Sequence, residues 1–291
     1  DGLAGLSGAN FLTVSDAPTW STGAGSLGTF TGNLNGAVAT VSASGEGITY
    51  AETTNVLTNS SLANCSLNSS TGAITTTDFD GSSTSARTHT FTIRATDTQG
   101  QTSDREFTLT SSYTYTINAL VVAGGGAGNN ANSGGGGGGG MRTTNWTIGS
   151  GTVYTIVVGQ GGAKGHLAIG ASGGNSSIAG TNVPSTPFTS AGGGAGGRDG
   201  DGVAGGSGGG GNYENNGASG NTPSTSPSQG AGGGNGLPTA PGYPGGGGGG
   251  GGASGVTGQN GQSGTVGGNG GNGTQSSITG SAVYYAGGGG G

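Results

Sequence analysis

The chain has 291 residues, of which 78 are glycine, 28% are hydrophobic and 6% are charged, and its formal net charge is −6. Lysine and arginine are scattered singly, which argues against nucleic acid and against an anionic membrane surface as partners. The sequence contains no run of 18 apolar residues, the length needed to span a membrane, and the start DGLAGLSGAN has no signal-peptide pattern. Such a start is expected for a fragment or for a protein exported without that signal.

Glycine and charge divide the chain near residue 113. Only 13 of the 78 glycines lie before residue 113, whereas nine of the twelve acidic residues do. We therefore predict an N-terminal linker at 1–15, a first domain at 16–112 and a glycine-rich domain at 113–291.

The first domain is predicted to be a β-sandwich, because short alternating segments recur with turn residues about every ten residues. In THTFTIRATD, Phe91, Ile93 and Ala95 share one face of a half-buried strand. The predicted strands are Ala37–Ser42, Ile48–Ala51, Ala73–Thr77, His89–Thr96 and Arg105–Thr110.

Polar side chains in this domain give weak signals for a site. Carboxylates are suitable Ca²⁺ ligands, but the DFDG and TDTQG segments are also good turns, and the turn interpretation is favoured. The carboxylates concerned are Asp78, Asp80, Asp97, Asp104 and Glu106. His89 and His166 have no evident partners, and Cys65 is expected to be a small buried residue. We predict no metal.

The stretch INALVVAGGGAGNN resembles the opening of a dinucleotide-binding fold, with Gly124 and Gly126 in place. Asn129 occupies the third glycine position. The following glycines, Gly134–Gly140, would each cost roughly 1 kcal/mol in a helix relative to alanine. Without that helix there is no pyrophosphate site, and no cofactor is predicted.

Three segments of the second domain have β-strand character: YTYTINALVVAG, NWTIGSGTVYTIVVGQGG and SSITGSAVYYAGG. The second is predicted to be a hairpin that turns at 149–151. We expect a small sheet that anchors the glycine segments. Its predicted apolar face comprises Trp146, Ile148, Val153, Ile156 and Val158.

Glycine recurs at every third position from Gly252 to Gly273. Polyproline-II geometry has three residues per turn, so this spacing places a glycine ridge along a rod of about 68 Å. The stretch lacks the proline of collagen. We predict polyglycine-II-like rods that hydrogen-bond laterally, with the other glycine runs as neighbours. A flexible linker is the alternative.

The first domain resembles the Ig-like (cadherin-like) modules of marine phage tail fibres and bacterial surface proteins. The similarity lies in APTWSTGAGSLGTF, LNSSTGAITTT and FTIRATDTQGQTSDREFTLT. It implies a spacer without catalytic residues. The segment TNVLTNSSLANCSLN departs from the family pattern, in which a proline-containing turn is common.

The second domain resembles glycine-rich domains of phage and marine bacterial surface proteins, through LVVAGGGAG, TVYTIVVGQGGA and SSITG in that order. Members often add a closing apolar strand, so we expect residues beyond Gly291. More distantly, the domain is similar to the polyglycine-II adhesin of T-even-like phage fibres. The predicted fold is all-β plus glycine-rich: a sandwich, then a small sheet that anchors a polyglycine-II-type bundle.

The resemblance implies a non-enzymatic phage tail-fibre adhesin in the virion. Its implied partners are a host receptor, either an outer-membrane protein or a glycan, and other fibre subunits, commonly in a homotrimer. An extracellular structural filament or surface protein of a bacterium is the alternative, and an ice-binding protein is a third interpretation. An enzyme is not expected, since the only close acids of the second domain, Asp199 and Asp201, lie in a glycine turn.

Recognition is predicted in the loops that interrupt the rods, because packed rods contact a receptor only at their ends. Tyrosine with asparagine is a mixture that antibody loops also use. The receptor-contact candidates are Asn212, Tyr213, Glu214, Asn215, Asn216 and Tyr243. Simple turns, with Tyr243 packed on proline, are the alternative. A second candidate region is 182–190.

Overall fold

The computed structural model describes residues 16–129, 133–149, 152–165, 168–238, 242–262 and 265–291. These residues form strands β1 to β16 and no helix, so the fold is all-β. The chain divides into two compact units, Asp1–Tyr115 and Thr116–Gly291, here called unit 1 and unit 2. The linker predicted at 1–15 lies outside the described residues. No helix in the described ranges has the length and hydropathy to cross a membrane.

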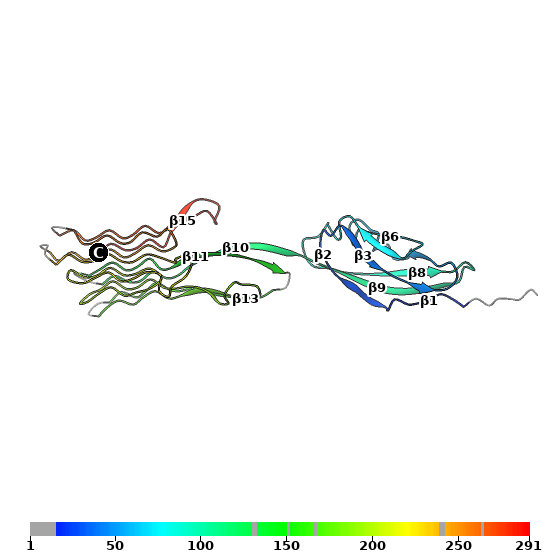
Figure 1. Cartoon of the computed structure of the whole chain (residues 1–291), viewed down its shortest axis with the longest axis horizontal. Coiled ribbons are helices and arrows are strands. Elements are labelled where there is room, and N and C mark those ends of the chain that lie inside the picture. The colour runs from blue at the N-terminus through cyan, green and yellow to red at the C-terminus, as the bar shows by residue number, and fades with distance from the viewer. Residues whose placement is uncertain (1–15, 130–132, 150–151, 166–167, 239–241, 263–264) are drawn as a thin grey trace, which may run out of the picture. The chain divides into compact units, whose positions relative to one another are not determined.

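Unit 1 contains a four-stranded sheet in the order β2-β9-β8-β5, a three-stranded sheet in the order β3-β7-β6, and the pair β1-β4 (Figure 1). β2 runs parallel to β9, and the other ladders are antiparallel. The bounds are β1 Thr19–Trp20, β2 Gly25–Thr31, β3 Gly36–Thr40, β4 Ala43–Ser44, β5 Thr49–Glu52, β6 Cys65–Leu67, β7 Ala73–Thr76, β8 Thr88–Thr96 and β9 Thr102–Ser112.

The core of unit 1 lies between these sheets. Phe91, Ile93 and Ala95 of β8 are fully buried, as their alternation predicted. They belong to one cluster with Ile74 of β7 and Phe107 of β9. Burying side chains of this size removes most of their apolar surface from water, which stabilises the fold by roughly 25 cal/mol for each Å² buried.

The strand predictions are correct for the long, alternating segments and incomplete elsewhere. The predicted strand at 37–42 corresponds to β3, and β9 extends beyond its predicted bounds at both ends. β1, β2, β4 and β6 were not predicted. β2 has the sequence GSLGTFT, whose glycines disfavour a strand locally, and it is held by its ladder with β9.

Cys65 is buried in the core of unit 1, as predicted. Burial raises the pKa of its thiol to about 11. At pH 8 the reactive thiolate should therefore be on the order of 100-fold scarcer than in the unfolded chain. We expect iodoacetamide to modify Cys65 at least about 100-fold more slowly in the native protein than in about 6 M guanidinium, which unfolds the chain. Mass spectrometry measures the two rates. Equal rates would contradict this burial.

The strands of unit 2 form three small sheets. β10 (Thr114–Val122) lies beside β11 (Met141–Gly149); β12 (Tyr154–Val157), β13 (Ser176–Gly180) and β14 (Phe188–Ser190) form the second sheet; and β15 (Thr274–Ser276) pairs with β16 (Val283–Tyr285). A second core cluster contains Val121, Trp146, Val183 and Phe188. The predicted small sheet is thus three separate sheets, of which the β10-β11 pair and the three-stranded sheet share this cluster.

One prediction for these strands was wrong, and another was correct only in part. In the described residues β11 pairs with β10 and β12 pairs with β13, so the predicted hairpin ladder does not form; Ser150 and Gly151 of its turn lie outside those residues. Trp146 is buried and Ile148 packs against the cluster, as predicted, but Val153, Ile156 and Val158 are 84%, 66% and 78% exposed. β12 is an edge strand of its sheet, and Val183 and Phe188 complete the apolar cluster instead.

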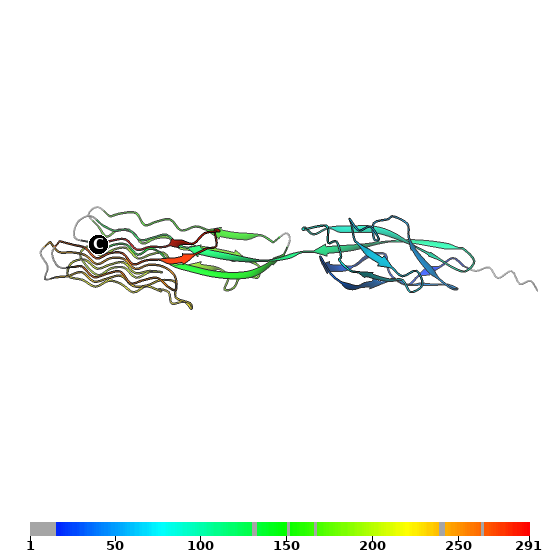
Figure 2. The same cartoon turned by 90° about the horizontal axis from the view of Figure 1, so that it is seen from above.

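Extended glycine-rich runs fill the rest of unit 2 and lie side by side (Figures 1 and 2). The chain passes back and forth through them, turning at the strands and at the opposite end of the bundle. The runs are 123–129, 133–140, 158–165, 168–175, 191–197, 202–206, 207–212, 216–220, 230–236, 245–251, 256–262, 266–273 and 286–291.

Backbone hydrogen bonds between the runs repeat every third residue. Along the run 191–197, N–H groups three residues apart donate to one neighbouring run, and adjacent N–H groups donate to different runs. The donor–acceptor pairs are Gly193–Gly124, Gly196–Ala127, Gly194–Ser207 and Gly197–Gly210. This threefold pattern is that of a polyglycine-II-type bundle, in which lateral bonds pair the backbone without helix or sheet.

The central run of the bundle, 245–251, has neighbours on all sides. Every N–H from Gly246 to Gly251 donates to another run, and the carbonyls accept in return, at N···O distances of 2.8–3.0 Å. Its neighbours are the runs 133–140, 207–212, 230–236, 256–262, 266–273 and 286–291. Six neighbours around one rod require very close approach, which glycine permits because it has no side chain.

The long straight rod predicted for 252–273 is wrong. Gln259 donates its N–H to the carbonyl of Asn269, and Gln262 donates to that of Val266, so the chain reverses direction between them. The threefold glycine spacing continues through this reversal. Two antiparallel runs, 256–262 and 266–273, therefore replace one rod.

Candidate functional site

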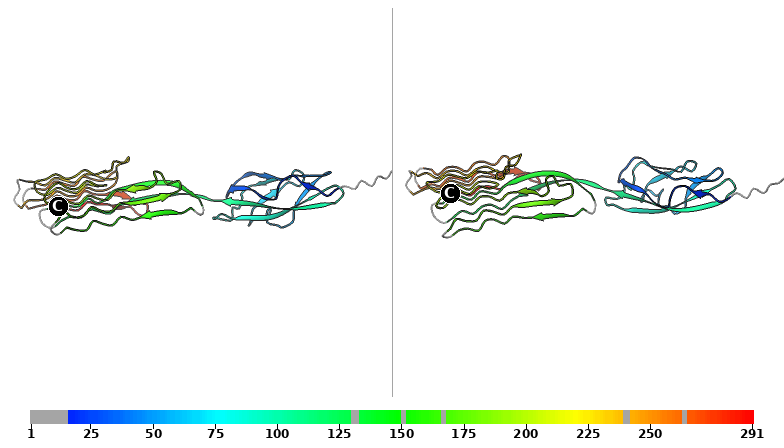
Figure 3. Two further views of the ribbon diagram at one scale, coloured as in Figure 1. Left: turned by 90° about the horizontal axis from the view of Figure 1, so that it is seen from below. Right: turned by 60° about the horizontal axis from the view of Figure 1, so that its bottom comes forward.

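The turns at the end of the bundle away from the strands form the candidate site, here called the tip loops (Figure 3). Their described parts are 198–201, 213–215, 237–238 and 242–244. Each follows an outward run and precedes an inward one. Because neighbouring runs are hydrogen-bonded along their length, the ends of the runs are held next to one another, and residues far apart in sequence meet there.

Tyr213 and Tyr243 come into contact in the tip loops. Their ring centroids are 4.6 Å apart at an interplanar angle of 55°. Tyr213 is partly buried, whereas Tyr243 is 50% exposed. Tyr243 also has a φ of 54°, a conformation that is uncommon for a bulky residue. The pair presents an aromatic surface at the end of the bundle, as the prediction of a shared role requires.

Asn212 and Asn215 hold the loop that carries Tyr213. Asn212 is only 3% exposed, and its side-chain amide donates to the carbonyl of Arg198 in the adjacent loop. Its oxygen accepts from the side chain of Asn215, and the Asn215 N–H donates to the Asn212 carbonyl at 3.0 Å. Asn212 is therefore a positioning residue, with little surface for a receptor.

Glu214 and Asn216 are exposed, as surface contacts need to be. The N–H of Asn216 donates to the carboxylate of Asp201 at 2.8 Å, which ties the loop at 213–215 to the loop at 198–201. The sequence placed Asp201 in a glycine turn, beside Asp199 as a pair of close acids. The hydrogen bond between Asp201 and Asn216 forms only because two turns fifteen residues apart pack together. No sequence pattern indicates that these two turns are neighbours.

A hollow of about 250 Å³ lies beside Tyr243. Amide and hydroxyl groups from other runs line it, together with backbone: Asn129, Ser133, Gly242, Tyr243, Pro244, Gly245, Thr265, Gly267 and Gly291. Hydroxyls, amides and an aromatic ring in a shallow hollow suit a polar ligand such as a glycan or a polar protein loop.

The alternative region, 182–190, lies at the opposite end of the bundle, next to the strands. Pro184, Ser185 and Phe188 line a separate cavity there. The structure therefore does not bring this region together with the tip loops. The two sequence-predicted regions are distinct surfaces of unit 2.

No three His, Cys, Asp or Glu residues are grouped so as to hold a metal ion in the parts of the chain that the structure describes. The carboxylates considered for Ca²⁺ have other contacts: Asp104 pairs with Arg94, and Asp97 accepts backbone N–H groups. His89, predicted to lack partners, has its Nε2 3.3 Å from Asp80. His166 lies outside the described residues.

A family model described as a glycine-rich domain matches residues 101–291. No curated protein matches the sequence. Similar solved structures include Drosophila N-cadherin EC1-4 (11% identity, 60% of this chain and 47% of that chain, TM-score 0.32) and the human desmocollin-1 ectodomain (14%, 48% and 29%, TM-score 0.30). Protocadherin gammaB7 EC3-6 is similar at 12% identity, over 60% and 46%, with a TM-score of 0.35. The chain spans less than half of each of these structures.

Proposed function

We propose that this chain, which belongs to the glycine-rich domain family, is a receptor-binding adhesin of a phage tail fibre. In this proposal the protein is extracellular or part of the virion, and it acts without catalysis. Unit 1 serves as a spacer and unit 2 carries the contact surface. The partner is a protein or glycan on the surface of the host cell.

The contact between Tyr213 and Tyr243 carries the proposal. An aromatic pair held by a rigid scaffold offers contact area at low entropic cost, which is characteristic of binding hot spots. Exposed Glu214 and Asn216 surround it with polar groups. The hydrogen bonds of Asn212 and Asn215 fix the loop before any partner arrives, so little ordering energy is lost on binding.

The non-enzymatic role is supported by the acids of unit 2. Asp199 and Asp201 occupy one tip turn and Glu214 another, and the Asp201 carboxylate accepts a backbone N–H. The side chain of Asp199 is 86% exposed. General acid–base chemistry relies on carboxyls held in a shielded pocket, which such an exposed turn does not provide.

Attachment measurements test this proposal. We expect the double variant Tyr213→Ala, Tyr243→Ala to lose at least about tenfold in affinity for cells and outer-membrane vesicles of a responsive strain from a panel of marine Gram-negative bacteria. The matched control is Tyr284→Ala, since Tyr284 is 65% exposed on β16, away from the tip loops. The measurement is binding of labelled protein, with the fold checked by circular dichroism.

Unchanged attachment by the folded double variant would remove the tip loops from the receptor site. If the wild-type chain bound none of the cells and instead assembled into filaments, the adhesin proposal would fail in favour of an extracellular structural protein. Equal losses in the double variant and in Tyr284→Ala would also contradict a local role for the tip.

A further inference from the structure

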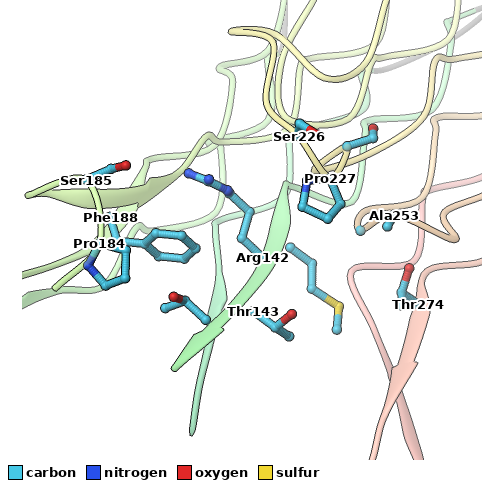
Figure 4. Close-up of a pocket in the computed structure, with 13 residues that line it drawn as sticks. Arg142, Thr143, Pro184, Ser185, Phe188, Ser226, Pro227, Ala253 and Thr274 are labelled. Atoms are coloured by element: carbon cyan, nitrogen blue, oxygen red, sulfur yellow. The ribbon is translucent and has the colours of Figure 1, made fainter. Parts of the chain in front are cut away.

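A cavity of about 350 Å³ lies at the strand end of unit 2, away from the tip loops (Figure 4). Segments from five parts of the chain line it: the start of β11, the loop before β14, the loop at 226–228, the turn at 252–253, and β15. The lining residues are Met141, Arg142, Thr143, Thr144, Pro184, Ser185, Phe188, Ser226, Pro227, Ser228, Gly252, Ala253 and Thr274. Its volume is within the usual range for small-molecule sites.

Arg142 is fixed in this cavity by two contacts. Its guanidinium lies 4.1 Å from the centre of the Phe188 ring, and its Nη1 donates to the carbonyl of Thr189 at 2.8 Å. Figure 4 shows the guanidinium beside Phe188, with Ser226 and Pro227 on its other side. Burial lowers the pKa of Arg142, which means that the charge is partly withdrawn from water. The remaining N–H donors of a guanidinium held in this way are available to a ligand.

No carboxylate lines the cavity, and no ion pair within the described residues includes Arg142. The acidic residues of unit 2 are Asp199, Asp201 and Glu214, all in the tip loops at the other end of the bundle. Arg142 is thus a partly buried cation without an anionic partner in its own unit. A partly buried guanidinium forms its strongest hydrogen bonds with a ligand that carries a negative charge.

The rest of the lining combines hydroxyl groups with apolar faces. The hydroxyls of Thr143, Ser185 and Ser226 have no hydrogen bond to other described residues. Pro184, Phe188 and Pro227 provide flat apolar surface close by. A sugar ring needs both features, because its hydroxyls form hydrogen bonds while its C–H face packs on rings.

We propose that this cavity binds an acidic saccharide, with the carboxylate of a uronic acid residue paired to Arg142. Guanidinium matches the planar geometry of a carboxylate and can bind it through two parallel N–H···O bonds. The hydroxyls of Thr143, Ser185 and Ser226 then contact the sugar hydroxyls, and the prolines pack against the ring. The site is independent of the receptor contact proposed for the tip loops, and the two can succeed or fail separately.

The experiment is a titration of the whole chain with D-glucuronic acid, followed by calorimetry and by the NMR signal of the Arg142 Nε–H. We expect saturable binding and a shift of that signal, at least about tenfold weaker binding of D-glucose, which lacks the carboxylate, and no saturable binding of acetate, which lacks the ring. A trigalacturonate arm distinguishes a polymer from a free sugar acid: tighter binding than for the monomer indicates a polysaccharide chain, and equal binding indicates the monomer.

Two variants test the assignment to this cavity. Arg142→Gln should weaken glucuronate binding at least about tenfold, since it removes the charge-assisted pair. Ser226→Trp keeps the arginine and fills the cavity from an exposed loop position, so it should abolish binding without touching the apolar core. The matched control is Lys164→Gln, which removes the same charge from an exposed position on the run 158–165.

The proposal is overturned if glucuronate does not bind the wild-type chain, or if Ser226→Trp binds it as well as the wild type does. Equal weakening by Arg142→Gln and Lys164→Gln would indicate a general charge effect and would also overturn it. Saturable binding of acetate with the same affinity as glucuronate would also overturn the proposal, because the cavity would then recognise a carboxylate and not a sugar.

Discussion

Replacing Gly248 by alanine should strongly destabilise the glycine-run bundle, whereas the same replacement at Gly287 should be tolerated. Gly248 lies in the central run, and a Cβ there would be 2.1 Å from the carbonyl oxygen of Gly136 and 2.4 Å from its carbon. Real Cβ atoms do not approach that closely. A Cβ on Gly287 would meet nothing within 4 Å.

The cost at Gly248 is large because the obstructing atoms are backbone. Gly248 donates to Gly289 at 2.9 Å and accepts from Gly271 at 2.8 Å, so moving its run away from Gly136 strains bonds to other runs. Overpacking in a tight core costs about 1–3 kcal/mol and more where nothing can yield; we expect at least about 3 kcal/mol. Gly287→Ala should be neutral or stabilising by about 0.5 kcal/mol, since alanine restricts the unfolded chain.

Thermal and guanidinium unfolding of the two single variants check this prediction, with amide hydrogen exchange to identify unit 2 as the part affected. Equal midpoints for Gly248→Ala and Gly287→Ala would contradict close packing around the central run. Loss of protection confined to the residues next to position 248 would indicate that neighbouring runs relax independently.

Asp80→Ala should destabilise unit 1 by about 3 kcal/mol, because it removes the acceptor of a buried polar network. Asp80 is fully buried. Its carboxylate accepts hydrogen bonds from Arg87 and, at 2.5 Å, from the Ser111 hydroxyl. The same carboxylate lies 3.3 Å from His89 Nε2. The backbone carbonyl of Asp80 accepts from Tyr113 Oη at 2.5 Å. Without the carboxylate, buried His89 and Ser111 lose their partner.

The same network predicts how stability depends on pH. Burial alone would raise the pKa of Asp80, but the hydrogen bonds from Arg87 and Ser111 and the contact with His89 lower it below its ordinary value. A lowered pKa in the folded state means that the carboxylate stabilises the fold above the ordinary aspartate value of about 4 and loses this effect as the pH falls through the folded value.

Denaturant unfolding between about pH 6 and pH 2, followed by tryptophan fluorescence in a Trp146→Phe background so that only Trp20 of unit 1 reports, measures both effects. Asp80→Asn should be less stable than the wild type at pH 6, and the difference should shrink as the pH falls. Asp104→Ala is the control, because its pair with Arg94 is exposed and should matter little. A difference between Asp80→Asn and the wild type that stays constant with pH would show that the charge of Asp80 is not the cause.

The network around Asp80 adds to the sequence interpretation of DFDG as a turn. The turn is present, since Gly81 donates to the Asp78 carbonyl at 3.2 Å. However, Phe79 and Asp80 are both fully buried. Local sequence can specify a turn, but whether the turn lies at the surface depends on what packs over it, here β8 and the end of β9.

Features that repeat at a fixed spacing can be read from the sequence alone. Alternation in THTFTIRATD specified β8 and its buried face, and glycine at every third position from Gly252 specified rods that pair laterally. Ala195 and Ser207 mark places in the bundle with room for a side chain: Ala195 is fully buried, and the Ser207 hydroxyl accepts from the Gly139 N–H at 2.8 Å. Periods of two and three are local geometry, which neighbouring residues alone can encode.

Which segments come into contact depends on how the folded chain packs. Three features each join residues from separate segments through tertiary packing: the reversal between Gln259 and Asn269, the contact of Tyr213 with Tyr243, and the placement of Arg142 on Phe188. Glycine runs are nearly interchangeable in sequence, so their order in the bundle cannot be read from composition. Lateral hydrogen bonds between whole runs fix that order, and with it the positions of the loops that carry the aromatic and charged side chains.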